Sequence, residues 1–371
     1  MFTTRLKVVL VLLLLSGAAV LIFSCAQLKP KPLSVDIQQR LLMQDAKDVL
    51  LNADVTVSLV GDIMLGGTAE EILQREGYDY AFAETRHLLT RSAITFGNLE
   101  GPLATWGLVD PDKTWSYKSA PAESASALSR AGFDIVSLAN NHALDYGIAG
   151  MVQTMQALDK KNIIHVGGGM NIDEARQPRI IDKNGRKLAF LAYSLTFPDS
   201  FWATEQYGGV AFGHLDHIVA DIRAAKKKAD IVMVSVHWGR ESTTELRPYQ
   251  ESIGHAAIDA GASIVIGHHP HVLQAVEQYK QGVILYSLGN FAFGSYSKKV
   301  DSSVIAQAYF KDNKLSQMRF WPIDVRNTEV LFQSRILDSD RADRVVQHLQ
   351  ELSADKGTQI VNDNGTAVVF M

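Results

Sequence analysis

The 371-residue sequence contains a single cysteine, Cys25, so no disulfide can form within the chain. It also lacks an excess of either charge. Its 36 lysines and arginines are balanced by 40 aspartates and glutamates, which argues against nucleic acid as a partner. Long apolar runs are missing after residue 23, and the mean hydropathy near zero excludes a polytopic membrane protein. The composition is that of a globular protein long enough for a large core, in one domain or two.

The amino terminus differs from the rest of the chain. Arg5 and Lys7 precede an apolar run over residues 8–23, which is short for a membrane span. The run ends in Leu21-Ile22-Phe23-Ser24-Cys25, which resembles a bacterial lipoprotein box. We therefore interpret residues 1–25 as a signal peptide with lipidation at Cys25, and an uncleaved signal anchor or a released protein as the alternatives. All three place the folded part outside the cytoplasm, and the first two anchor it to the membrane on the periplasmic or extracellular face.

Residues 26–52 predict a linker and a tether helix. Pro30 and Pro32 mark the linker, and residues 35–51 carry apolar side chains at helical spacing. We assign residues 53–326 to the main domain. Residues 327–371 predict a helix and a strand packed on that domain.

Along the main domain, short apolar runs alternate with helix-like stretches. The runs cover residues 55–60, 94–96, 133–138, 163–166, 187–193, 231–236, 263–266 and 282–286. The predicted helices cover residues 69–76, 122–131, 145–158, 218–228 and 249–260. This alternation predicts an α/β fold with a parallel or mixed sheet covered on both faces. Later residues predict antiparallel strands over 303–310, 315–321 and 323–325, a turn at Asp312-Asn313, a helix over 341–352 and a strand over 367–370.

A histidine cluster follows the predicted strand at residues 263–266. His268, His269 and His271 come directly after the strand, where a loop begins. Ligands bind at the carboxyl ends of strands in open α/β sheets, and neutral imidazole is a common ligand of divalent metals. His269 and His271 are therefore candidate metal ligands.

Other strands of the predicted sheet also end in polar residues. Asp62, Asn141 and His237 each follow an apolar run, and we predict that they join the metal site. A shell of carboxylate, amide and imidazole groups suits Mn, Zn or Fe better than Mg or Ca, and it does not identify the metal. The sequence thus predicts a divalent-metal cleft at the strand ends.

Candidate catalytic and substrate-binding residues come from the same strand ends. His142 is a candidate acid or base, Glu100 a candidate catalytic carboxylate, and Asp145 could orient His142 or cap the next helix. Candidate substrate contacts are Asn98, Trp238, Arg240 and Asn290. Arg240 would bind an anionic substrate or simply be solvated.

Six segments in order resemble the CapA family, the poly-γ-glutamate capsule synthesis proteins that include the PgsA type. They are SLVGDIMLGG, FGNLEGPL, SLANNHALDYG, VSVHWGRE, IGHHPHVLQ and YSLGNFAFG, within about residues 55–325. The family is similar to calcineurin-like metallophosphoesterases, which implies a four-layer α/β/β/α sandwich with a metal centre at the strand ends. By this likeness Asp62, Asn141, His237, His269 and His271 would be ligands and His142 the catalytic imidazole.

The sequence departs from the metallophosphoesterase pattern at two places. Ile63 and Met64 follow Asp62, so the usual Asp-x-His opening is absent. Gly97-Asn98-Leu99-Glu100 stands where Gly-Asp-x-x-Asp is usual. The resemblance therefore implies either a site with two metal ions, as in metallophosphoesterases, or a site with one.

The resemblance implies an anchored, metal-dependent hydrolase or transferase that helps to make, process or export an anionic surface polymer. Its substrate would be anionic or peptide-like, and its membrane tether suggests a membrane biosynthesis complex as a partner. A non-catalytic polymer-binding or export accessory and a phosphoesterase with another substrate are the alternatives.

Overall fold

A computed structural model of the protein describes residues 52–109, 111, 113–296 and 300–371. The predicted signal peptide, Cys25 and the tether helix lie outside these residues. Within the described part of the chain, no helix combines the length and apolar character needed to cross a membrane.

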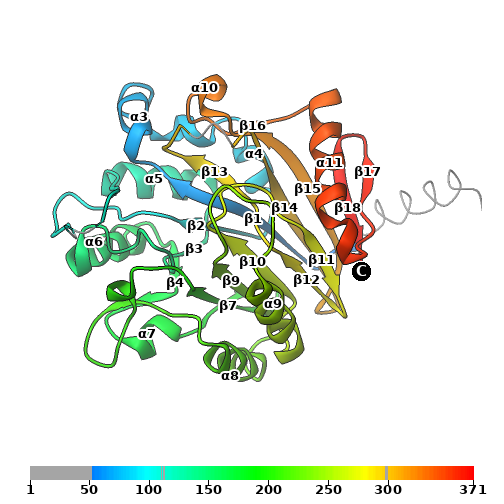
Figure 1. The fold of residues 1–371 in the computed structure, drawn as a ribbon, viewed down its shortest axis with the longest axis horizontal. Helices are drawn as coiled ribbons and strands as arrows, with labels where there is room; N and C mark the ends of the chain where they lie inside the picture. Colours follow the sequence, from blue (N-terminus) through cyan, green and yellow to red (C-terminus); the bar gives the residue numbers. More distant parts are fainter. Residues whose placement is uncertain (1–51, 110, 112, 297–299) are drawn as a thin grey trace, which may run out of the picture. The chain divides into compact units, whose positions relative to one another are not determined.

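The larger of two main sheets joins a parallel half to an antiparallel half (Figure 1). In the parallel half, β1 pairs with β2, β2 with β3, and β3 with β4, while β13 pairs with the end of β1. These strands are β1 (Val55–Met64), β2 (Ile94–Leu99), β3 (Ile135–Ser137), β4 (Ile164–Val166) and β13 (Asn290–Phe293). The antiparallel half is β14 (Ser302–Lys311), β15 (Lys314–Asp324), β16 (Arg335–Ile336), β17 (Val361–Asp363) and β18 (Thr366–Phe370).

The second sheet has a parallel centre and antiparallel edges. Its order is β11 (Val276–Tyr279), β12 (Gly282–Leu285), β10 (Ile264–His268), β9 (Ile231–His237), β7 (Arg186–Ser194) and β6 (Arg179–Lys183). A small pair, β5 (Gly168–Gly169) and β8 (Gly209–Val210), lies apart from both sheets in the pairing scheme. The central runs are fully buried because each sheet is covered on both faces.

Three buried clusters define four layers. Side chains such as Leu59, Phe96 and Met233 fill the space between the two sheets. A second cluster joins the other face of the large sheet to helices α3 (Glu70–Glu76), α4 (Arg86–Leu89), α5 (Pro121–Ala131) and α6 (Gly147–Asp159). A third joins the second sheet to α7 (Ile172–Arg176), α8 (Leu215–Lys226) and α9 (Pro248–Ala260). The predicted α/β/β/α sandwich is therefore confirmed.

The remaining helices are α10 (Asn327–Val330) and α11 (Ser339–Ser353). Helix α11 contributes Val346 and Leu349 to the core between the sheets, and β17 and β18 extend the large sheet. The turn at Asp312-Asn313 has the two positive φ angles, 49° and 64°, that a tight hairpin needs.

Two local predictions were wrong. Residues 315–321 and 323–324 belong to one strand, β15, because Pro322 stays paired opposite Val304 and its carbonyl accepts a hydrogen bond from Leu337 N–H on the other side. Val325, predicted to be in a strand, lies just after the end of β15. Short strands such as β6 were missed because an edge strand such as Arg179–Lys183 has only two apolar residues among three charged ones and therefore no apolar run.

Candidate metal centre

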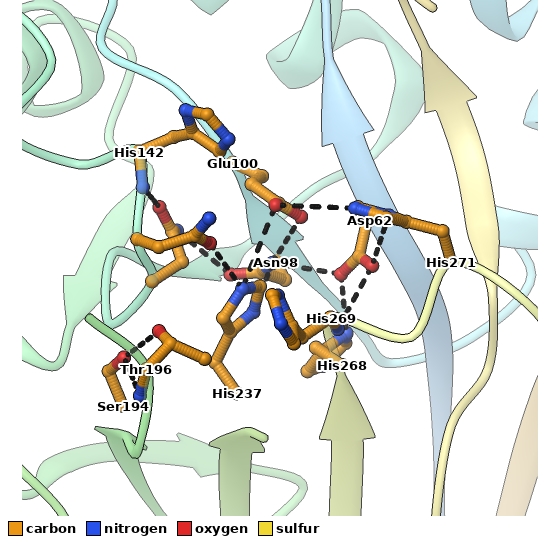
Figure 2. A network of polar contacts seen from close by, with 12 residues as sticks. Asp62, Asn98, Glu100, His142, Ser194, Thr196, His237, His268, His269 and His271 are labelled. Carbon is orange, nitrogen blue, oxygen red and sulfur yellow. Dashed lines mark hydrogen bonds and ion pairs between the residues drawn. The ribbon is translucent and has the colours of Figure 1, made fainter. Parts of the chain in front are cut away.

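The carboxyl ends of the parallel strands meet in one buried polar cluster (Figure 2). Strands β1 and β2 of the large sheet bring Asp62 and the Asn98–Glu100 segment, and β9 and β10 of the second sheet bring His237 and the histidines after residue 267. Parallel strands in one sheet end at the same edge, and the face-to-face packing of the sheets brings both edges together.

Asp62 is fully buried near the end of β1. Its carboxylate accepts hydrogen bonds from Asn98 Nδ2 at 2.8 Å, His268 Nδ1 at 3.1 Å and the backbone N–H of His269 at 3.2 Å. Burial alone would raise the pKa of Asp62, but the hydrogen bonds from His268 and His271 hold it well below its usual range. Asp62 is therefore a fixed anion.

The close approach of β1 to the segment before β13 depends on Gly61. A Cβ atom at Gly61 would lie 1.9 Å from the carbonyl oxygen of Gly289. The contact lets Asp62 N–H donate to that oxygen at 3.0 Å and places Asp62 opposite Asn290. Gly61 is thus required for the position of Asp62.

Two groups of side chains have the geometry to hold a metal ion, and they share Glu100. One group is Asp62, Glu100 and His237, and the other is Glu100, His269 and His271. Within each group the potential ligand atoms all lie within 4.8 Å of one another. Figure 2 shows Glu100 between Asp62 and His271 on one side and His237 on the other. Glu100, predicted to be catalytic, therefore has the position of a shared ligand.

The donor atoms of this cluster fit a divalent cation. Glu100 Oε1 and His269 Nδ1 are buried, and neither has a hydrogen-bond partner among the described residues. Burial and the nearby charge of Asp62 raise the pKa of Glu100 well above its usual range. A cation would relieve that penalty and satisfy both atoms. The mixture of carboxylate and imidazole suits Mn, Zn or Fe.

His271 carries the positive charge of the metal-free cluster. Burial alone would lower its pKa, but the carboxylates of Glu100 and Asp62 raise it to about 10. Its Nδ1 donates to Asn290 Oδ1 at 2.9 Å and lies 3.3 Å from Asp62 Oδ2, while Nε2 lies 3.8 Å from Glu100 Oε1. A metal ion that binds here would therefore replace a proton.

His237 and His269 have the opposite tendency. Burial holds the pKa of His237 well below its usual range, and burial with the charge of His271 lowers the pKa of His269 to about 3. Both rings are therefore neutral, the form that binds metals. His237 Nε2 lies 2.7 Å from Asn141 Oδ1, so Asn141 also belongs to the cluster.

The backbone after β10 is held in a costly conformation. His269 has φ 96° and His271 has φ 60°, in the region that favours glycine. Such positions cost on the order of 1–3 kcal/mol and are frequent at binding sites. Here they turn the side chains of His269 and His271 toward Glu100.

A second group, next to the ligands, surrounds His142. His142 Nδ1–H donates to Asp145 Oδ2 at 2.7 Å, and Tyr117 N–H donates to the same carboxylate at 2.7 Å. Lys113 from the loop after Pro102 forms an ion pair with Asp145. Burial lowers the pKa of His142, so its imidazole is neutral near pH 7. Asp145 therefore orients the imidazole and leaves Nε2 for proton transfer.

The predicted substrate contacts are not all at the surface. Trp238 is fully buried, and its indole N–H donates to Tyr286 O at 2.9 Å, so the prediction that Trp238 contacts the substrate was wrong. Trp238 follows His237 directly, and successive side chains in an extended segment point to opposite sides. The side chain of Trp238 therefore points away from the polar cluster. Asn98 is also fully buried, and its amide bonds to both Asp62 and Asn140. Asn98 therefore orients Asp62 and does not face a substrate.

The other two predicted substrate residues have different surroundings. Asn290 is buried and fixes the ring of His271, which is a supporting role. Arg240 is exposed, and it has no ion pair with any residue in the part of the chain that the structure describes. Arg240 alone among the four keeps the position expected of a substrate contact.

The sequence interpretation gave no role to two residues that the structure brings into the site. His268 is fully buried and holds Asp62, although only its neighbours His269 and His271 were assigned. Lys113 lies in a long loop without a motif, so no sequence signal marks it. For His268 the available signal was its position directly after the predicted strand over residues 263–266, next to the two assigned histidines.

Comparison with known proteins follows the same segment of the chain. The family model described as "Bacterial capsule synthesis protein PGA_cap" matches residues 56–295, a range that contains every candidate ligand. The chain is 35% identical to "Capsule biosynthesis protein CapA" of Bacillus anthracis over 303 residues, covering 79% of this chain and 73% of that protein. It is 34% identical to "PGA biosynthesis protein CapA" of Bacillus subtilis (strain 168) over 272 residues, covering 73% and 72%.

Among solved structures, the chain is similar to the Haemophilus influenzae NAD nucleotidase. The TM-score is 0.47 and the identity 9%, with 80% of this chain and 62% of that chain covered. That likeness is weak, and the assignment to a family rests on the sequence matches.

Proposed function

The chain belongs to the bacterial capsule synthesis protein PGA_cap family, and from that premise we propose that it acts in the synthesis, processing or export of poly-γ-glutamate or a similar anionic surface polymer. We propose further that it does so as a metal-dependent hydrolase or transferase. The observation that supports this is the pair of ligand groups that share Glu100, within 4.8 Å of one another in each group, inside the matched segment.

The residues of the site divide into a binding set and a proton-transfer set. Asp62, Glu100, His237, His269 and His271 would hold the metal, which when bound would supply a Lewis acid for an acyl or phosphoryl oxygen. His142, held through Nδ1 by Asp145, would give or take a proton at Nε2. Arg240 at the surface would contact the anionic polymer.

The location of the protein is part of the same proposal. The apolar run before Cys25 would attach the chain to the membrane by lipidation or as a signal anchor. The folded part would then act outside the cytoplasm, next to a membrane complex that makes or exports the polymer.

The first experiment is metal analysis of the purified full chain. We expect bound Mn, Zn or Fe in the wild type, one or two ions per chain, and loss of the metal in His271→Ala. His255→Ala is the matched control, because His255 binds Glu277 and lies outside the cluster. A well-folded wild type that stays free of metal after reconstitution would contradict the proposed chemistry.

Turnover separates the proposed function from its alternatives. The metal-loaded protein would be incubated with poly-γ-glutamate and with simple phosphoesters, beside a His142→Asn variant that keeps all five candidate ligands. Polymer cleavage or transfer that His142→Asn abolishes supports the proposal. Turnover of phosphoesters alone supports a phosphoesterase, and polymer binding that His142→Asn leaves unchanged supports a non-catalytic accessory.

A further inference from the structure

An apolar loop tip projects from the fold beside the candidate metal centre. Trp106, Leu108 and Val109 are close together in the sequence, and their exposed fractions are 65%, 87% and 43%. They belong to the loop that runs from Pro102 to Ala120 and passes α6 (Figure 1). Leu108 has the largest exposed fraction of the exposed large apolar residues in the described chain. Trp106, Leu108 and Val109 together form an exposed apolar patch, and such patches mark interaction sites.

The tip is held in place by Tyr146, the residue before α6, and by Gln153 in the middle of α6. Gly107 has φ 156°, and a Cβ atom there would lie 2.0 Å from the carbonyl oxygen of Tyr146. Gln153 Nε2 donates to Trp106 O at 2.8 Å, and its Oε1 accepts from Thr105 N–H at 3.0 Å. The backbone beside Trp106 and Leu108 is therefore fixed, and their exposure is a property of the fold.

Further apolar side chains continue this surface. A Cβ atom at Gly147 would lie 3.2 Å from Leu108 O, and one at Gly208 would lie 2.5 Å from Ile148 Cδ1 and 3.1 Å from Met170 Cα. The side chains at or next to these contacts, those of Leu108, Ile148, Met170 and Tyr207, are exposed. We call the whole set the apolar rim, and it consists of Trp106, Leu108, Val109, Ile148, Met170 and Tyr207.

We propose that the apolar rim docks on the surface of a lipid bilayer. Tryptophan and tyrosine favour the membrane interface, and exposed leucine and valine gain free energy by entering the acyl region. The carboxylates of an anionic polymer fit this surface poorly, because aromatic rings present a negative face.

The length of chain before the fold allows this contact. The inference rests on the proposed membrane attachment through the apolar run over residues 8–23. Phe23 and Asn52 are separated by 28 residues, which reach at most about 100 Å when extended. The fold therefore stays within reach of the bilayer to which its amino terminus is attached, and the apolar rim can meet that bilayer.

Docking would set the position of the candidate metal centre. The loop that carries the apolar rim starts two residues after Glu100, and Tyr117 and Lys113 of the same loop bind Asp145. A bilayer against the apolar rim would therefore hold the cluster close to the lipid surface. A polymer that leaves a membrane complex would reach the site without diffusing away.

Tryptophan quenching by lipid tests the proposal on the full chain. The chain has five tryptophans, of which Trp238 is fully buried. The protein would be reconstituted into phosphatidylcholine vesicles with brominated acyl chains, and flotation would show that it stays bound. We expect Trp106→Phe to lower the quenched intensity by about twofold or more. Trp321→Phe is the control, because Trp321 lies in β15 and bonds to Gln307.

A second variant keeps every tryptophan. Leu108→Glu puts a charge at the exposed tip and should remove the quenching while the protein still floats with the vesicles and melts at the wild-type temperature. Equal quenching in the wild type, Trp106→Phe, Leu108→Glu and Trp321→Phe would overturn the proposal, as would a wild type that floats without quenching. A wild type that does not float would overturn both the docking and the membrane attachment, whereas the metal analysis would still stand.

Discussion

Two buried polar networks of this protein differ in how completely they satisfy their own atoms. Around Gln307, the side-chain nitrogen donates to Ser58 Oγ and Leu88 O, both at 3.3 Å, and the oxygen accepts from Tyr309 OH and Trp321 Nε1 at 3.0 and 2.8 Å. Around Glu100, by contrast, the buried Oε1 atom of the carboxyl group has no hydrogen-bond partner within the described chain.

The contrast distinguishes polar groups that stabilise the fold by themselves from polar groups that are stabilised only when a ligand binds. The Gln307 network is uncharged and has donors and acceptors matched, so it contributes to stability. The Glu100 network keeps two carboxylates and several imidazoles close together, which costs free energy unless a cation joins them. The same sheet therefore contains a completed network and one that lacks a component.

The largest expected effect comes from removing the shared carboxylate. Glu100→Gln keeps the shape of the side chain but removes a ligand from both groups. Metal affinity should fall by more than the roughly 100-fold that changes outside the ligand shell produce. Isothermal titration calorimetry measures this loss. Glu277→Gln, a buried carboxylate that binds Tyr286 and His255, is the matched control and should bind metal normally.

The opposite effect is expected in the completed network. Gln307→Ala leaves the hydroxyl of Tyr309 and the indole N–H of Trp321 without their partner, so the free energy of unfolding should fall by about 2–4 kcal/mol. Urea denaturation of the metal-free protein gives this value. Metal affinity should stay the same, and a large loss of affinity would show that the two networks are coupled.

The pH dependence should also differ between the networks. His271, with a pKa raised to about 10, and Glu100, with a raised pKa, both lose a proton when metal binds. Between pH 6.5 and about 10 the metal affinity should rise by up to about tenfold per pH unit for each proton released. Calorimetry in buffers of different ionisation enthalpy counts these protons. A proton count of zero at pH 7 would contradict the assigned charge of His271.

Stability of the metal-free protein should have the opposite slope in the same range. The folded pKa of His271 lies above its unfolded value of 6.5, so its contribution is complete below pH 6.5 and is lost as pH rises through about 10. The amide of Gln307 does not titrate. Melting temperatures of the wild type and His271→Asn, measured from pH 6 to pH 10, should therefore converge at high pH.

The smallest effect is expected from the residue behind Asp62. His268→Leu removes the hydrogen bond to Asp62 Oδ1 and should weaken metal binding by about tenfold, because the carboxylate loses its orientation. His268→Asn, whose amide can donate from a similar position, should restore most of the affinity. Equal affinities in His268→Leu and the wild type would show that Asn98 and the backbone N–H of His269 fix Asp62 without His268.

Much of the fold and part of the site could be predicted from the sequence. Apolar runs located nearly all the central strands, because buried parallel strands have continuous apolar sequences. Strand ends in turn identified Asp62, Asn141, His237, His269 and His271, all of which the structure places in one cluster. Edge strands such as β6 were missed because most of their side chains are not buried, so their sequences have no apolar run.

Other features depend on contacts between segments far apart in the sequence. The burial of Trp238 and the link from Lys113 to Asp145 follow from the packing of loops and helices, which no local pattern describes. Glu100 follows the end of a strand, and many carboxylates in such positions are turn residues. Only the arrangement of both sheets shows that it lies between two sets of ligands.

By itself, the sequence determined which residues lie at the carboxyl edge of each strand, because strand periodicity and strand ends are local properties of the chain. The tertiary structure alone decided which of these residues meet. The packing of two sheets sets the distances across the edge, Gly61 sets the approach of β1 to Gly289, and the left-handed backbone at His269 and His271 sets the direction of their rings. Distance and direction in space, rather than residue type, decide whether a carboxylate and an imidazole can share one ion.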